Sequence, residues 1–314
     1  PMKKKESQTI NGIFPKSVNY NDVLQKILSH ENVASREPIY ESYDKNVQGR
    51  VLLERGHSNA GVVAPFDSKK FPEEIKEVCF SATLAHNPSL GKIDPYLVAQ
   101  YALLEACART VSVGASPIAI TDCLCFGNPE KPEQMWQFAQ SCLAIQKSCN
   151  LLRFGDIKNL PVVAGNVSFY NQSGDKAIPA SPMIGCFGKT TKKGLLHNSF
   201  QHKDSILYLV GSQHSDLGGS LFCNVMEVKN TKIGKIDVSK YSETLNALLK
   251  ANTQGLLESC SYSGLGGLAT SVSKMCFKNS IGCSIKPVKE ELLFSENLSF
   301  IVEIKKENAV SFQR

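Results

Sequence analysis

The sequence predicts an α/β (α+β) fold built from two domains. Three observations support this: a length of 314 residues, a globular composition of 42% hydrophobic and 20% charged residues, and short apolar segments that alternate with helical patterns. A single domain usually has roughly 100–200 residues. A chain of this length can also bury a large core without disulfides or metals.

Residues 1–40 are expected to be a linker with one short helix. Apolar side chains recur at helical spacing over residues 21–29, and Asn19 or Asn21 is a suitable N-cap. The polar stretch before this helix carries no periodic pattern.

The first domain is expected over residues 41–190. Its clearest helix is predicted over residues 93–113, because Asp94 fits the N-cap and Pro95 the first helical position. Gly114 marks its end. The other expected elements are a helix over 132–151 and strands over 117–126, 160–170 and 182–187.

The second domain is expected over residues 191–314, because the pattern of strands and helices starts afresh after Lys192. The predicted elements are strands over 205–210 and 300–304 and helices over 242–259 and 268–277.

Charge and cysteine usage exclude several classes of protein. The 35 basic and 29 acidic residues give a net charge of +6 in short scattered runs, which argues against a nucleic-acid partner. The eleven cysteines contain no C-x-x-C pair, and the spacing of Cys123 and Cys125 is poor for a zinc knuckle. Reduced thiols in a cytoplasmic protein are expected.

No apolar run reaches the roughly 20 residues that span a bilayer, and no apolar signal-peptide segment follows the Lys-rich start. We therefore expect no membrane partner. Pro1 before Met2 resembles the scar of a removed tag.

Four polar or glycine positions in two predicted strands could carry chemistry. Asp122 lies in an apolar strand, where a carboxylate is costly unless it is paired or binds a ligand. Gly165 allows close approach of a ligand, Asn166 offers an oxygen to Mg²⁺, and Ser168 supplies a hydroxyl. A local turn at Asp122 and a β-bulge at Gly165 explain the same pattern.

Two glycine-rich stretches, DLGGS at 216–220 and SGLGG at 263–267, are compatible with phosphate binding at a helix start. Plain turns are the favoured interpretation, because neither stretch matches a Walker motif or a dinucleotide fingerprint.

One block is far more specific. TDCLCFGNPEKPEQMWQF at 121–138 resembles the TDCLNFGNPEKPE-x-x-WQ signature of the phosphoribosylformylglycinamidine synthase family. Further blocks resemble the same family in the same order: NVASREPIYESYDKNVQG at 32–49, IDPYLVAQYALLEA at 93–106, PVVAGNVSFYN at 161–171, IPASPMIGCFG at 178–188, DLGGSLF at 216–222 and LLFSENLSF at 292–300.

The resemblance implies a fold and a reaction. The chain is similar to the second of two copies of an aminoimidazole-ribonucleotide-synthetase-like (PurM-like) unit, with a mixed sheet-and-helix domain followed by an α/β sandwich domain. The implied reaction is that of a carbon–nitrogen ligase with glutamine as amido donor. ATP activates the amide oxygen of formylglycinamide ribonucleotide, and ammonia then displaces the phosphate to form the amidine.

The resemblance also implies cofactors, partners and site residues. The cofactors are ATP and Mg²⁺, and the partners are a glutaminase subunit, a small PurS-type subunit and a missing N-terminal half. Asp122 and Gly165 match ATP contacts, Asn166 matches a Mg²⁺ ligand and Ser168 matches a substrate contact. No catalytic residue of the family falls in this half.

Several positions depart from the family pattern. Cys125 and Arg109 stand where the family has Asn, and Tyr262 and Leu265 stand where it has Asp. Of an auxiliary nucleotide site implied at Glu105, Arg109 and Tyr262, only Glu105 survives. We expect this site to hold no Mg²⁺-nucleotide and a Glu105–Arg109 ion pair to replace the cation; an ordinary helix pair explains the spacing equally well.

The last domain is expected to be truncated, and the chain alone is expected to show no turnover. Two alternatives remain open. One is a stand-alone ATP-dependent enzyme of the aminoimidazole-ribonucleotide or selenophosphate synthetase superfamily. The other is a non-catalytic, degenerate half that persists as a scaffold.

Overall fold

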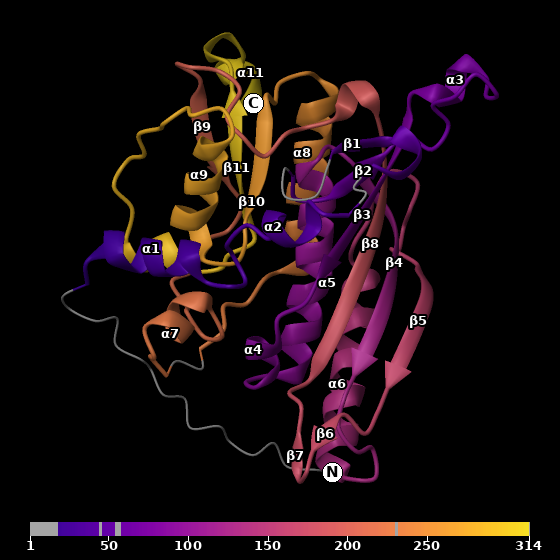
Figure 1. Cartoon of the computed structure of the whole chain (residues 1–314), viewed down its shortest axis with the longest axis vertical. Helices are drawn as coiled ribbons and strands as arrows, with labels where there is room; N and C mark the ends of the chain where they lie inside the picture. Colours follow the sequence, from indigo (N-terminus) through magenta and orange to yellow (C-terminus); the bar gives the residue numbers. More distant parts are fainter. Residues whose placement is uncertain (1–17, 44–45, 54–57, 230–231, 314) are drawn as a thin grey trace.

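The computed structural model describes residues 18–43, 46–53, 58–229 and 232–313. Its main element is a six-stranded mixed sheet (Figure 1). In spatial order the strands are β1 (Val51–Leu53), β2 (Gly61–Val63), β3 (Val78–Ala85), β8 (Ser181–Thr191), β4 (Ser116–Cys125) and β5 (Val162–Ser168). Neighbouring strands are antiparallel except β4 and β5, which are parallel. The predicted α/β class is confirmed.

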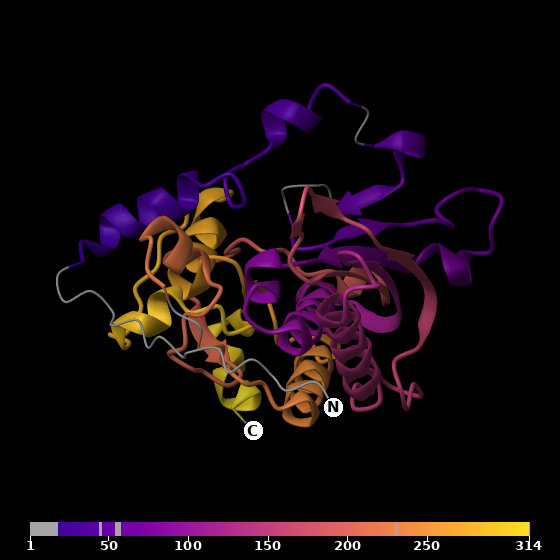
Figure 2. The same cartoon turned by 90° about the horizontal axis from the view of Figure 1, so that it is seen from below.

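Helices α5 (Pro95–Ser112), α6 (Pro132–Cys149) and α8 (Val238–Thr253) lie side by side on one face of this sheet (Figure 2). Asp94 caps α5 as predicted, since its Oδ1 atom accepts from the backbone N–H of Tyr96 at 2.9 Å and of Leu97 at 3.0 Å. Most of α5 is buried, because it packs on α6, on β3 and β8, and on the second sheet.

The second sheet is antiparallel, with strand order β10 (Ser259–Ser263), β11 (Ser299–Ile304) and β9 (Ile206–Val210). Helix α9 (Gly267–Phe277) covers this sheet, and its Met275 packs in one buried cluster with Ile301 of β11. The predicted helix over 242–259 is wrong at its C-terminal end. Helix α8 stops at Thr253, Gly255 adopts a φ of +70°, and β10 begins at Ser259.

Helix α1 (Tyr20–Ser29) has Asn19 as its N-cap, one of the two caps predicted. Its buried residues Val23 and Ile27 pack with α7 (Leu221–Val225) and α10 (Glu290–Phe294), so the helix belongs to the C-terminal part of the molecule (Figure 2). The remaining short elements are α2 (Glu37–Tyr40), η1 (Val47–Gly49), α3 (Glu73–Lys76), α4 (Pro88–Gly91), β6 (Gln172–Ser173), β7 (Lys176–Ala177), η2 (Lys192–Gly194), η3 (Lys306–Asn308) and α11 (Ala309–Phe312).

The largest hydrophobic core continues across residue 190. Leu103 and Ile184 from the first part of the chain share it with Tyr241, Leu245 and Phe300 from the second. Helix α5 lies between the two sheets, since it contacts β8 of the first sheet and β10 of the second.

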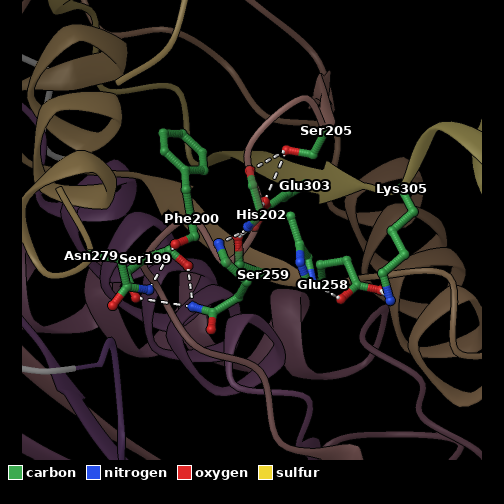
Figure 3. Close-up of polar contacts among 10 residues, drawn as sticks. Ser199, Phe200, His202, Ser205, Glu258, Ser259, Asn279, Glu303 and Lys305 are labelled. Atoms are coloured by element: carbon green, nitrogen blue, oxygen red, sulfur yellow. Dashed lines mark hydrogen bonds and ion pairs between the residues drawn. The ribbon is translucent and has the colours of Figure 1, made fainter. Parts of the chain in front are cut away.

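A buried carboxylate fastens the second sheet to the loop that precedes it. Glu303 on β11 is fully buried and accepts from the backbone N–H groups of Gln201 and His202, both at 2.8 Å. The hydroxyls of Ser205 and Ser259 also donate to it, at 2.9 and 2.7 Å (Figure 3). Four donors offset the cost of burying the charge.

Cysteine chemistry agrees with the sequence: all eleven cysteines are free thiols. Among the described residues, no helix combines the length and apolar character needed to cross a membrane.

Candidate functional site

The four candidate ligand-binding residues lie on the parallel pair β4 and β5. Asp122 is in register with Gly165, Cys123 with Asn166, and Cys125 with Ser168. Residues far apart in the sequence therefore meet as neighbours on two adjacent strands (Figure 1). Strand β5 is the edge of the sheet, and six of its seven residues are exposed.

Asp122 and Gly165 share the face of the sheet that carries α6. Asp122 lines a groove of about 370 Å³ together with Leu124 and the α6 residues Cys142 and Cys149. A Cβ atom at position 165 would lie 2.8 Å from the Asp122 Oδ1 atom, so only glycine leaves the carboxylate its space. No described side chain pairs with Asp122, and burial raises the pKa of its carboxyl group.

Asn166 and Ser168 lie on the opposite, open face, because side chains alternate along a strand. The Asn166 Nδ2 atom is 3.6 Å from the Cys123 sulfur. Asn171 holds Ser168 in place, with its Nδ2 atom 2.9 Å from the Ser168 carbonyl oxygen and 3.1 Å from its Oγ atom.

The four residues therefore meet at one edge of the sheet but not on one face. A ligand that contacts all of them must pass around β5, or must reach Gly165 through its main chain. The missing Cβ at Gly165 permits such an approach. The sequence placed these residues on two strands but did not show on which face each one lies.

Glu105, Arg109 and Tyr262 are brought together between α5 and β10. The Glu105 Oε1 atom accepts from the Arg109 NH2 atom at 2.7 Å, from its Nε atom at 3.2 Å, and from the Tyr262 hydroxyl at 2.9 Å. The guanidinium carbon lies 5.3 Å from the Tyr262 ring centroid. Burial raises the pKa of Tyr262, which keeps the hydroxyl protonated as a donor. The expected Glu105–Arg109 ion pair is present.

Glu296 joins the two glycine-rich turns. Glu296 lies in the LLFSENLSF block at 292–300, but the sequence predicted no role for it. Its Oε1 atom accepts from the backbone N–H of Leu221 at 2.9 Å and of Gly266 at 3.0 Å, at the starts of α7 and α9. The chain's own carboxylate thus occupies the N–H groups that a phosphate would use, which agrees with the favoured interpretation as turns.

Glu296 also has an unusual ionisation. Burial raises the pKa of this carboxyl group to about 7, although the two backbone hydrogen bonds from Gly266 and Leu221 act in the opposite direction. It lines a small cavity of about 60 Å³ with Glu105, His214 and Asp216. Among the described residues, no group of three or more His, Cys, Asp or Glu side chains is arranged to hold a metal ion.

Residues 57–190 match the family model of the AIR synthase related protein, N-terminal domain. The chain therefore contains a domain of the AIR-synthase-related class.

Within that class the chain is similar to phosphoribosylformylglycinamidine synthase subunit PurL, which confirms the resemblance seen in the sequence. It is 34% identical to PurL of Sulfurimonas denitrificans over 297 residues, which cover 93% of this chain and 38% of that protein. It is 32% identical to PurL of Methanothrix thermoacetophila over 295 residues, which cover 90% and 37%. The chain thus spans about two fifths of the length of these relatives.

Solved structures agree on the fold. Thermotoga maritima PurL complexed with ADP has a TM-score of 0.62 at 21% identity, over 89% of this chain and 39% of that one. The same protein complexed with FGAR also has a TM-score of 0.62, at 20% identity, over 87% of this chain and 37% of that one.

Proposed function

We propose that this chain contributes one side of the ATP site of a phosphoribosylformylglycinamidine synthase of the PurL type. The observation that carries the proposal is the β4–β5 pair, which brings Asp122, Gly165, Asn166 and Ser168 to one sheet edge in register. The homology to PurL supports the same assignment, and relatives of that name have been solved with ATP and FGAR.

In the proposed reaction, formylglycinamide ribonucleotide, ATP and glutamine-derived ammonia give the amidine, ADP and phosphate. The γ-phosphoryl group is transferred to the amide oxygen, and ammonia then replaces that phosphate at carbon. Gly165 would let ATP approach the strand closely, and the Ser168 hydroxyl would orient the substrate. Positioning of this kind is the protein's main contribution to phosphoryl transfer.

Mg²⁺ fits the residues present, though as a weakly held ion. Asn166 is exposed and offers a neutral oxygen, and Mg²⁺ in such sites usually takes one or two protein ligands together with substrate phosphates. When bound, Mg²⁺ would offset negative charge on the phosphates. Asp122, whose pKa is raised by burial, lies on the other face of the sheet.

A missing N-terminal half is part of the proposal. The open face of the main sheet carries apolar groups: Phe80 stacks on Phe187 with ring centroids 5.6 Å apart, and Leu84 is 60% exposed. An apolar sheet face of this kind typically packs against another protein surface. A glutaminase subunit and a small PurS-type subunit would complete a cytoplasmic complex, and the chain alone would show no turnover.

A non-catalytic scaffold is the second candidate function. The Glu105–Arg109–Tyr262 cluster favours it, because this cluster fills the auxiliary nucleotide site that the family resemblance implies. Arg109 supplies there the positive charge that a Mg²⁺-nucleotide site would take from its metal.

The test is ATP and substrate binding by the chain together with the rest of a PurL protein. N166A should weaken Mg²⁺-dependent ATP binding about 10–100-fold, the usual effect of removing a metal-site residue. S168A should weaken substrate binding and leave ATP binding unchanged. T244A, a change at a partly exposed position on α8, serves as the control. Unchanged affinities in both N166A and S168A would refute the assignment.

A further inference from the structure

The turn after β5 fixes the position of Ser168 through one side chain, the amide of Asn171. Its Nδ2 atom lies 2.9 Å from the Ser168 carbonyl oxygen and 3.1 Å from the carbonyl oxygen of Phe126, directly after β4. The backbone of Asn171 is also held, since its N–H donates to the Phe126 carbonyl at 3.1 Å and its own carbonyl accepts from the Ile178 N–H at 3.0 Å. Asn171 therefore joins the ends of the two strands that carry the candidate site.

Tyr170 adopts a backbone conformation that is unusual for its residue type. Its φ is +60°, in the left-handed region that a bulky side chain rarely adopts, and its ring is 58% exposed. Packing of the ring therefore does not explain the strain, whereas a backbone hydrogen bond from the Tyr170 N–H to the Gly127 carbonyl at 3.0 Å helps to hold it. The left-handed residue turns the chain back, so that the Asn171 side chain meets Ser168 three positions earlier. Strain of this kind is concentrated at ligand sites.

The contacts of Asn171 also determine the role of the Ser168 hydroxyl. Two backbone carbonyl oxygens, which only accept hydrogen bonds, identify the nitrogen end of the amide. The Ser168 Oγ atom lies 3.1 Å from this nitrogen and accepts a hydrogen bond from it. Donation by Ser168 to the Asn171 Oδ1 atom is long at 3.4 Å, because O–H···O bonds usually measure about 2.5–3.0 Å. Within the described part of the chain the hydroxyl has no other polar partner, so its proton is left for a ligand.

We propose that Asn171 is the positioning residue of the substrate contact at Ser168. Its amide holds the oxygen of this hydroxyl and leaves the proton to a ligand on the open face of the sheet. The substrate atom bound there is therefore an oxygen that accepts a hydrogen bond, of the phosphate or carbonyl type. Asn171 itself does not touch the substrate. The proposal rests on the proposed function, because it takes Ser168 as a substrate contact.

The test is calorimetric binding of formylglycinamide ribonucleotide and of ATP to the chain together with the rest of a PurL protein. N171A should weaken substrate binding about 5-fold, the usual effect of losing one hydrogen bond, and should leave ATP binding unchanged. The double variant S168A/N171A should bind substrate no more weakly than S168A, because Asn171 then has no hydroxyl to position. Q172A, which changes the exposed amide side chain next in the sequence, is the matched control.

ATP binding separates a positioning role from a purely structural one. Gly165 on the same strand is a proposed ATP contact, so a variant that only disorders β5 weakens the binding of ATP and substrate together. N171D is the second variant, because it keeps the shape of the side chain but can only accept hydrogen bonds. It should turn the Ser168 proton away from the ligand and weaken substrate binding at least as much as N171A.

The positioning role is overturned if N171A and N171D bind substrate like wild type, or if N171A costs the same affinity in wild type and in S168A. If S168A itself binds substrate like wild type, the proposed substrate contact fails together with this proposal, so the two failures are distinguishable. The ribonucleoside that lacks the phosphate identifies the acceptor. S168A and N171A should still weaken its binding if the acceptor is a carbonyl oxygen, and should have no effect if it is a phosphate oxygen.

Discussion

Two carboxylates in strands of the two sheets have opposite surroundings. Glu303 on β11 is fully buried and accepts from four donors. Asp122 on β4 is partly buried, lines a groove and pairs with no described side chain. A carboxylate with all its acceptor sites filled has a structural role, whereas one that faces a groove without a donor is free to meet a ligand.

The largest expected effect tests the structural side of this contrast. E303A should lower the free energy of unfolding by about 3–5 kcal/mol, because it leaves a cavity and four unpaired donors. Urea denaturation measures the difference. The matched control is D122A, which removes a carboxylate that makes no hydrogen bond and should change stability by less than about 0.5 kcal/mol. Equal losses in the two variants would contradict the contrast.

Glu296 is an intermediate case, because it is partly buried and accepts only two backbone hydrogen bonds. Its pKa is raised from 4.5 to about 7, so the folded state holds a proton that the unfolded state has lost between these values. Stability should therefore fall as the pH rises through this window, by up to about 3 kcal/mol.

The measurement is urea unfolding of wild type and E296Q at about pH 5 and about pH 8. E296Q keeps an oxygen for Leu221 and Gly266 but cannot ionise. The wild type should lose stability relative to E296Q as the pH rises. A constant difference between the two proteins would show that Glu296 does not carry this dependence.

The sequence predicted the elements that have local signals. Asp94 and Pro95 mark the start of α5, and the apolar runs mark β4 and β11. It failed where pairing is non-local: β10 was not predicted, because SCSYS has no clear strand pattern and only its partner β11 makes it a strand. The position of β8 between β3 and β4 likewise depends on contacts across the sheet.

The same division holds for the candidate site. The block around Asp122 and the GNVS run stood out in the sequence because an aspartate, a glycine and an asparagine are unusual inside apolar strands, and the structure places these two strands side by side. Which face each residue occupies depends on the register of β4 against β5, which no local pattern encodes. Glu296 lay in a noted block, but its two partners come from residues 75 and 30 positions away along the chain.

The Glu105–Arg109–Tyr262 cluster should show a smaller, coupled effect. E105Q and R109M should each cost about 2 kcal/mol, because each leaves a partner of a largely buried ion pair unpaired. The double variant should cost less than the sum of the single changes. Y262F, which removes one hydrogen bond to the same oxygen, should cost about 1 kcal/mol. Additive losses would instead indicate an ordinary exposed helix pair.

The smallest effect tests the unpaired carboxylate itself. G165A should cost about 1 kcal/mol, because the new Cβ meets the Asp122 Oδ1 atom at 2.8 Å, while the edge strand β5 can shift to relieve part of the contact. In a D122A background the same change should cost almost nothing, since the oxygen is gone. Urea denaturation of the four proteins gives the coupling directly. A cost of G165A that is the same in both backgrounds would mean that strand conformation, and not the space around Asp122, requires glycine at this position.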